Sequence, residues 1–187
     1  MEVIPNWHPV FVHFVVGLFS TSVGFYILLY TLSRMRLFSL NLTNELEIVA
    51  RWCLWLAGLL ALPTALLGLY AYNTVSHDAP SHMAMTTHRN WALPTATLIM
   101  LVSAWSLWRY FRNKTLTVTF LLLLIITQGM LLTTAWLGGE LVYRYGLGVM
   151  SLPQQSAHDG HNHTEGMDSD AANAEVPEAE NHDQHNH

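Results

Sequence analysis

The chain has 187 residues, of which 51% are hydrophobic and only 11% are charged, and its formal net charge is −5. This composition, together with a positive mean hydropathy, excludes an ordinary soluble globular protein and indicates a membrane protein. The negative net charge comes largely from the C-terminal tail, so it says little about partners of the membrane body, and we expect no nucleic-acid partner.

Four apolar windows are long enough to cross a bilayer as helices, at about residues 10–32, 52–72, 90–110 and 116–137. The first window is too long for a signal-peptide core and lacks a small-residue cleavage site, so we interpret it as an uncleaved span. Short connections predict an up-and-down bundle with the first and third helices diagonally opposed. The predicted fold class is therefore an all-α, polytopic membrane protein, with a four-transmembrane-helix bundle in residues 1–150 surrounded by membrane lipid.

Several residues inside the spans predict local features of the bundle. A ridge of small residues in the second span predicts close helix packing, and it consists of Ala57, Ala61 and Ala65. Pro63 lies beside this ridge and predicts a bend. In the fourth span, Gln128 predicts a hydrogen bond between helices. After that span, Gly138 and Gly139 predict a helix break followed by an interfacial segment.

Basic residues are unevenly distributed among the connections. The first connection is flanked by Arg34, Arg36 and Arg51, and the third is crowded by Arg109, Arg112 and Lys114. By the positive-inside rule these two connections are cytoplasmic, which places both termini and the second connection outside. We therefore predict a bacterial inner-membrane protein with its N-terminus and C-terminus in the periplasm.

All 11 histidines fall on the predicted outer side. In the first helix, His8 and His13 are five residues apart, so their side chains are rotated by about 140° relative to each other. We expect the deeper residue, His13, to face the bundle, because a polar group at membrane depth is costly and usually functional. A structural role is the alternative, with His8 as an interfacial anchor and His88 as a helix cap.

The second outer connection and the start of the third helix supply the candidate partners, His77, Asp78, His82 and His88. Pro80 is expected to open the third helix, so that His88 enters near the depth of His13. Across the bundle diagonal, His13 and His88 would then be the axial ligands of a haem b. The alternative is a smaller centre on a transition-metal ion (Zn, Cu or Ni), with imidazoles from His8, His13, His77 or His88 and a carboxylate from Asp78 or Glu140.

Residues 151–187 form a polar, acidic tail of low complexity, which we expect to be disordered. The tail carries two clusters of three histidines each, His158, His161 and His163, then His182, His185 and His187. Such tracts bind divalent metal ions readily but encode no fixed geometry. The alternative is a solvated extension that responds to pH.

Two stretches carry a resemblance to a known family, HPVFVHFVVGL from His8 onward and LGGELVYRYGLGV after the fourth span. With Gly68 in the second helix and His88 opening the third, they resemble the domain of unknown function 2231 family of four-helix bacterial membrane proteins, over roughly residues 7–150. Val15 stands where the family motif usually has proline, so straighter first turns are expected. Members are found joined to redox modules, and the resemblance therefore implies electron transfer. The His-rich tail is not part of the family core.

Three functions are open on these grounds. The first is handling of transition-metal ions by an outer-facing histidine centre and a metal-capturing tail. The second is a b-type haem subunit for electron transfer in the membrane. The third is a non-catalytic accessory subunit that docks a periplasmic redox or metal-carrier protein. Nothing in the sequence marks the chain as an enzyme, and we assign no catalytic residue.

Overall fold

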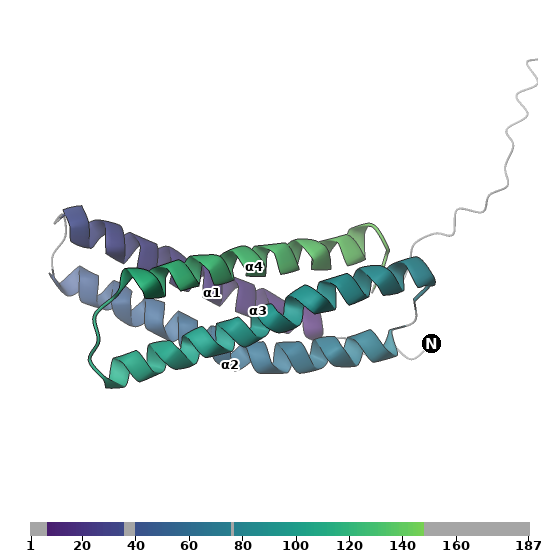
Figure 1. Ribbon diagram of the computed structural model, residues 1–187, viewed down its shortest axis with the longest axis horizontal. Helices are drawn as coiled ribbons and strands as arrows, with labels where there is room; N and C mark the ends of the chain where they lie inside the picture. The colour runs from purple at the N-terminus through teal and green to yellow at the C-terminus, as the bar shows by residue number, and fades with distance from the viewer. Residues whose placement is uncertain (1–6, 36–39, 76, 148–187) are drawn as a thin grey trace, which may run out of the picture. The chain divides into compact units, whose positions relative to one another are not determined.

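The computed structural model describes residues 7–35, 40–75 and 77–147. Within them the chain forms four helices and no strand: α1 (His8–Met35), α2 (Leu40–Thr74), α3 (Ala79–Phe111) and α4 (Val118–Tyr143) (Figure 1). All four are long and apolar enough to cross a membrane. These findings confirm the predicted all-α membrane fold with four spanning helices. The predicted disorder of the tail concerns residues outside those described.

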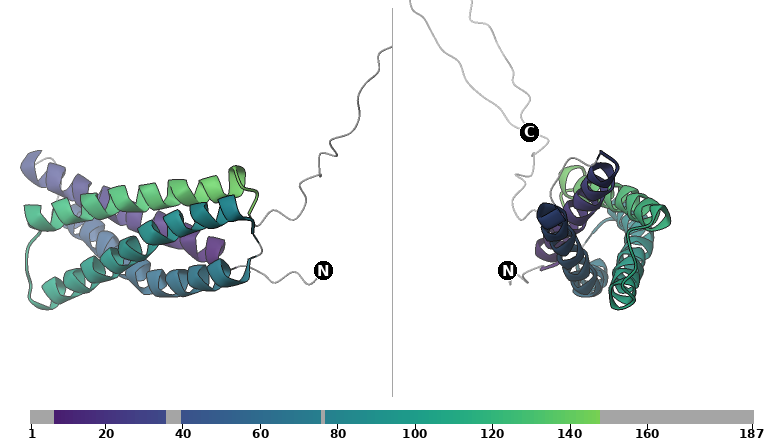
Figure 2. Two further views of the ribbon diagram at one scale, coloured as in Figure 1. Left: turned by 45° about the vertical axis from the view of Figure 1, so that its right-hand side comes forward. Right: turned by 90° about the vertical axis from the view of Figure 1, so that its left-hand side faces the viewer.

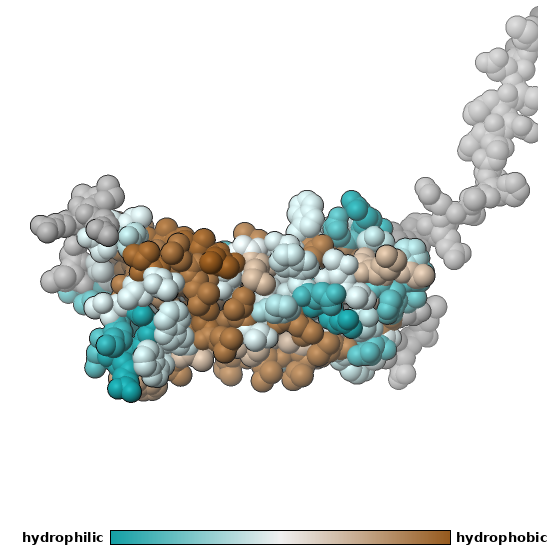
Figure 3. Space-filling view, in the orientation of Figure 1, coloured by the Kyte–Doolittle hydropathy of each residue, from teal (hydrophilic) through white to brown (hydrophobic). Residues whose placement is uncertain are grey.

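Two of the helices are much longer than the bilayer is thick. The 35 residues of α2 and the 33 residues of α3 correspond to about 50 Å each, against about 30 Å of hydrocarbon. Both helices begin about a dozen residues before the spans expected from hydropathy, which adds polar turns to one end of each. Figure 3 shows the result on one face, where an apolar band lies between ends with more hydrophilic side chains.

Local sequence determines where the helices begin and end. Asp78 caps the start of α3, where its side chain accepts a hydrogen bond from the backbone N–H of Ser81, and a proline follows in the first turn. Thr117 caps α4 in the same way. After α4, the chain turns away through Gly146, whose φ of 63° is in the left-handed region that favours glycine.

The expected helix break at Gly138 and Gly139 is wrong, because α4 continues through both residues to Tyr143. Glycine inside a helix costs only about 1 kcal/mol relative to alanine, which the packing of a bundle readily offsets. α2 also continues through Pro63 without a break. Its two halves follow different directions in Figure 1, which agrees with the bend predicted there.

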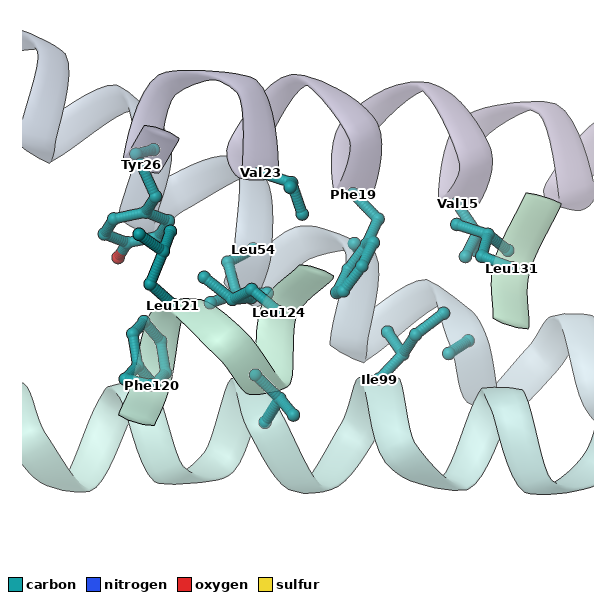
Figure 4. Close-up of a cluster of buried hydrophobic side chains, with 14 of the residues drawn as sticks. Val15, Phe19, Val23, Tyr26, Leu54, Ile99, Phe120, Leu121, Leu124 and Leu131 are labelled. Carbon is teal, nitrogen blue, oxygen red and sulfur yellow. The ribbon is translucent and has the colours of Figure 1, made fainter. Parts of the chain in front are cut away.

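The four helices pack as an antiparallel ring. α1 contacts α2 and α4, and α3 contacts α2 and α4, so α1 lies diagonally opposite α3. The end-on view in Figure 2 shows the helices surrounding a common axis. In Figure 4, apolar side chains from all four helices converge on this axis, among them Phe19, Tyr26, Leu54, Ile99, Phe120 and Leu124. The rings of Tyr26 and Phe120 meet edge to face, with centroids 5.5 Å apart.

Small and polar residues bring the helices together where the sequence predicts. Ala57 and Ala61 are fully buried, which confirms close packing along this part of the α2 ridge, whereas Ala65 is only partly buried. Beside them, the Ser103 hydroxyl donates to the Leu54 carbonyl at 2.8 Å and ties α3 to α2. The predicted hydrogen bond of Gln128 is also confirmed, since its amide donates to the Ser20 hydroxyl of α1 at 2.9 Å.

Gly58 provides a test of this packing. A methyl group at position 58 would collide with the side chain of Ser103, so we expect Gly58→Ala to lower the free energy of unfolding by about 1–3 kcal/mol. The matched control is Gly24→Ala in α1, where a methyl group meets nothing within 4 Å and should stabilise by about 0.5–1 kcal/mol. Unfolding in mixed detergent micelles measures both changes. Equal effects of the two substitutions would contradict the close α2–α3 approach.

Candidate functional site: a layer of two histidines and two glycines

One end of the bundle carries every histidine that the structure describes. At this end, which we call the histidine end, α1 and α3 begin and α2 and α4 finish. The five histidines are His8, His13, His77, His82 and His88. They do not form one cluster, and two separate arrangements include four of them.

The first arrangement follows from the core spacing of α1 and α3. Buried residues recur three or four positions apart along each helix, as expected for packed helices. In α1, one heptad before the buried Val15 is His8, and in α3 one heptad before the buried Thr95 is His88. The buried positions of each helix form a line along one side of it, which we call the buried seam. Each imidazole therefore lies on the buried seam of its helix, one heptad closer to the histidine end.

The corresponding positions of α2 and α4 are glycines. One heptad after the buried Ala61 is Gly68, and one heptad after the buried Leu131 is Gly138. The four helices thus contribute one layer with histidines on one diagonal and glycines on the other. We call His8, Gly68, His88 and Gly138 the histidine–glycine layer.

Each histidine of this layer lies directly against a glycine. A methyl group at Gly68 would lie 2.8 Å from Cε1 of His8, and one at Gly138 would lie 3.1 Å from Cε1 of His88. Carbon atoms in van der Waals contact are about 3.5–4.0 Å apart, so both rings occupy space that a larger residue would fill. The two glycines therefore admit the two imidazoles into the bundle.

The orientation of the His8 ring is fixed by a hydrogen bond. Its Nδ1 lies 3.0 Å from the backbone carbonyl oxygen of Thr64. Because a carbonyl can only accept, Nδ1 carries the proton and the lone pair of the ring is on Nε2. This is the arrangement that metal-binding histidines commonly have, with one nitrogen donating to a carbonyl and the other directed at the metal.

His88 presents the complementary feature. Its Nδ1 is buried and has no hydrogen-bond partner among the residues that the structure describes. The imidazole of His8 and the backbone of Thr134 both lie close to the His88 ring. Leaving such a buried polar atom unsatisfied costs about 1–3 kcal/mol, a cost that a bond to a ligand would remove.

The expected pairing of His13 with His88 is wrong, because His8 takes the place that we expected for His13. His13 is exposed, and its Nδ1 bonds to the Pro9 carbonyl of its own helix at 2.5 Å. The rotation of about 140° between positions 8 and 13 allows only one of them to face the axis. The seam through Val15 and Phe19 assigns that position to His8.

The second arrangement is a hydrogen-bonded chain between α2 and the start of α3. Nδ1 of His77 donates to the Val75 carbonyl at 2.6 Å, which leaves Nε2 to accept from Nδ1 of His82 at 2.8 Å. Nε2 of His82 then accepts from the Tyr72 hydroxyl at 3.3 Å, and this oxygen lies 2.9 Å from the Thr86 hydroxyl. The structure therefore joins His77 to His82, and not to the layer.

The carboxylates expected near the histidines have other contacts. Asp78 caps α3, and Glu140 pairs with Arg144 at 3.3 Å. Within residues 7–35, 40–75 and 77–147, no group of three or more His, Cys, Asp or Glu side chains could hold a metal ion. The six histidines of the tail lie outside the described residues. A ligand role for any of these side chains stays a prediction.

Residues 5–151 match the family described as "Predicted membrane protein (DUF2231)". The chain belongs to the DUF2231 family. The match confirms the resemblance drawn from the motifs, and it includes every residue of the histidine–glycine layer but not the tail. Comparison with curated proteins and with solved structures found no match.

Sequence reasoning missed the roles of Thr64 and Tyr72 in this DUF2231 chain. It named Gly68 only through the family resemblance. The signal for the layer was nevertheless present, because the heptad spacing of each span leads to His8, Gly68, His88 and Gly138 in turn. No comparable pattern predicts the role of Tyr72, because its contact with His82 depends on how the α2–α3 turn folds.

Asp78 gives this end of the DUF2231 bundle a pH dependence. Hydrogen bonds from the Ser81 hydroxyl and then from its backbone N–H hold the pKa of the Asp78 carboxyl below its usual 3.8. A lowered pKa stabilises the folded state above pH 3.8 and loses this effect as the pH falls through the folded pKa.

We therefore expect wild type and Asp78→Asn, which keeps a capping oxygen but cannot titrate, to converge in melting temperature as the pH is lowered from about 6 to about 3. Thermal unfolding in detergent measures the difference at each pH. A difference that is independent of pH would contradict the role of the carboxylate.

Proposed function

We propose that the protein is a b-type haem subunit that transfers electrons in the membrane, and that His8 and His88 would hold the haem. The observation that carries this proposal is the histidine–glycine layer, in which imidazoles on two diagonally opposed helices each pack against a glycine of a neighbouring helix. The proposal rests on these residues of the chain itself.

The number of protein donors favours haem over a bare ion at this position. Zinc sites take three or four protein ligands, and the described residues offer no such group. Haem iron needs only two, because the porphyrin supplies the others. Two imidazoles from opposite helices are therefore a sufficient donor set for haem iron.

The surroundings of the two rings also fit a haem. The glycines let the rings of His8 and His88 lie close to the backbones of α2 and α4, in space that a larger residue would fill. The unsatisfied Nδ1 of His88 is an atom whose environment a bound ligand would complete. When bound, haem iron supplies a carrier for one electron.

The protein itself orients the ligands and limits access of water. The Thr64 carbonyl holds the proton of His8 on Nδ1 and keeps Nε2 basic. On α3, the buried side chains of Ser81 and Met85 lie on the seam beyond His88. Toward the bundle centre, a 3.1 Å hydrogen bond between the hydroxyls of Thr95 and Thr134 joins α3 to α4.

The position of the layer favours electron exchange at the membrane surface. It lies where the apolar part of α4 ends, not at mid-membrane. With the histidine end in the periplasm, as the arginine distribution predicts, the partner would be a periplasmic redox protein. The orientation itself remains a prediction.

The proposal predicts a haem spectrum that depends on two histidines and not on a third. Purified wild-type protein should show a Soret band, and His8→Ala and His88→Ala should each abolish most of it. The double substitution should add little, because each ligand alone is insufficient. His13→Ala is the matched control, since it removes an exposed imidazole from the same helix, and it should retain the band.

A second, more conservative variant tests the proposal even if loss of an imidazole prevents folding. Gly68→Ala pushes against the His8 ring but keeps both ligands, so it should weaken haem retention while the helices remain folded by circular dichroism. Wild-type protein without haem after expression in haem-replete cells would refute the proposal. Equal losses in His8→Ala and His13→Ala would refute the assignment of ligands.

We also propose, as a second function, that the tail captures transition-metal ions. This proposal is supported by the two clusters of three histidines each in residues 151–187, with acidic neighbours, and it does not depend on the layer. A periplasmic metal carrier would be the corresponding partner. The tail would then concentrate ions such as Zn, Cu or Ni near the membrane.

Truncation after Pro153 tests the tail separately from the bundle. We expect loss of most weak divalent-ion binding, measured by elemental analysis, with an unchanged helical spectrum. Binding by the full chain should fade between about pH 7 and pH 5, because protonated imidazole cannot bind a metal and its usual pKa is about 6.5. An unchanged ion stoichiometry after truncation would show that the tail is only a solvated extension.

A further inference from the structure

The opposite end of the bundle contains a second candidate binding site. At this arginine end, α2 and α4 begin and α1 and α3 finish (Figure 1). A recess opens there between the helices. Its polar lining includes Arg51, Arg109, Lys114, Glu47, Tyr26 and Ser106. Three cations and one carboxylate thus border the same small space.

The charges of the recess are not balanced by ion pairs. Within the described ranges, the salt bridges are Arg144–Glu140 at the histidine end and Arg51–Glu47 here, at 3.8 Å. The second pair is loose, and the Glu47 side chain is 48% exposed. Such a pair contributes little and leaves Arg51 able to attract another anion.

Arg109 adds to the excess of positive charge in the recess, and its side chain is buried. Only 8% of the residue is exposed. Its guanidinium donates to neutral oxygens, the Thr115 carbonyl and the Thr117 hydroxyl, and lies over the ring of Phe120 at 5.1 Å. A buried cation that is surrounded by neutral groups creates a positive potential that favours a nearby anion.

Aromatic and apolar side chains surround the recess on its outer side. Tyr110 lines it and lies beneath the guanidinium of Arg51 at 4.7 Å, while Phe111 is 72% exposed beside it. Exposed aromatic residues at the end of an apolar span are typical of the membrane interface. An anion at this position would therefore lie at the depth of lipid headgroups.

We propose that the recess binds the phosphate group of an anionic phospholipid, with Arg51, Arg109 and Lys114 as the cationic contacts. A phosphodiester offers charged oxygens to guanidinium and ammonium donors, and the attached acyl chains extend along the apolar helix surface. The interfacial position favours a lipid over free phosphate, because the lipid gains burial of its chains in addition to the charge contact. This site is independent of the histidine–glycine layer.

Native mass spectrometry of the full chain in detergent tests the proposal, with phosphatidylglycerol and phosphatidylcholine offered in equal amounts. Wild type should retain phosphatidylglycerol preferentially. Arg51→Gln and Lys114→Gln should each lower its binding constant about fivefold, the effect expected for one interfacial cation. Arg112→Gln is the matched control, because Arg112 lies on the same connection but over Trp108, outside the recess lining, and it should change binding by less than twofold.

Three results would overturn the proposal. One is equal retention of the two lipids by wild type, and another is an equal loss in all three variants, which would indicate a general charge effect. The third is displacement of the lipid by millimolar inorganic phosphate, which would make the recess a site for free phosphate. Lys114 is exposed, so Lys114→Gln keeps the test decisive even where Arg51→Gln disturbs folding.

Discussion

The buried seam of each helix is the constraint on which the rest of this structure depends. Inside hydrocarbon the helices satisfy their own backbone hydrogen bonds, so the side chains that face the axis decide how the helices fit together. Along α2 these side chains are small, and Ser103 of α3 consequently reaches the backbone of Leu54. The same register, continued outward by one heptad, leads to His8 in α1 and to His88 in α3.

The two ends of the bundle use polar residues in opposite ways. At the histidine end the polar groups of the layer are two imidazoles, each packed against a glycine. At the arginine end they are permanent cations, of which Arg109 is buried among neutral oxygens and aromatic rings. The first arrangement suits a ligand that bonds to nitrogen, and the second suits a ligand that carries negative charge. The apolar band between them separates these two chemistries.

The sequence predicts the scaffold well because the bilayer imposes a simple rule. Hydropathy located four helices, and the polar Gln128 at mid-span was correctly expected to bond to another helix. The helix ends were predicted less well. Their polar turns, at the start of α2 and α3, lie outside the hydrocarbon, where hydropathy carries no signal.

The candidate site was predicted only in part. His88 was placed correctly at the start of the third helix, but depth alone suggested His13 as its partner. The rotation of α1 about its axis depends on the combined fit of its apolar residues against α2 and α4, and this fit selects His8. The contact between His77 and His82 depends on the turn before α3, which no periodic pattern encodes.

The contacts within the layer follow the order in which the chain is made. His8 lies against Gly68, and both belong to the first helical hairpin, whereas His88 lies against Gly138 in the second. Each hairpin therefore contains one complete histidine–glycine contact once its own two helices have packed. The two contacts form one layer only when the hairpins associate, so the layer depends on assembly of the whole bundle.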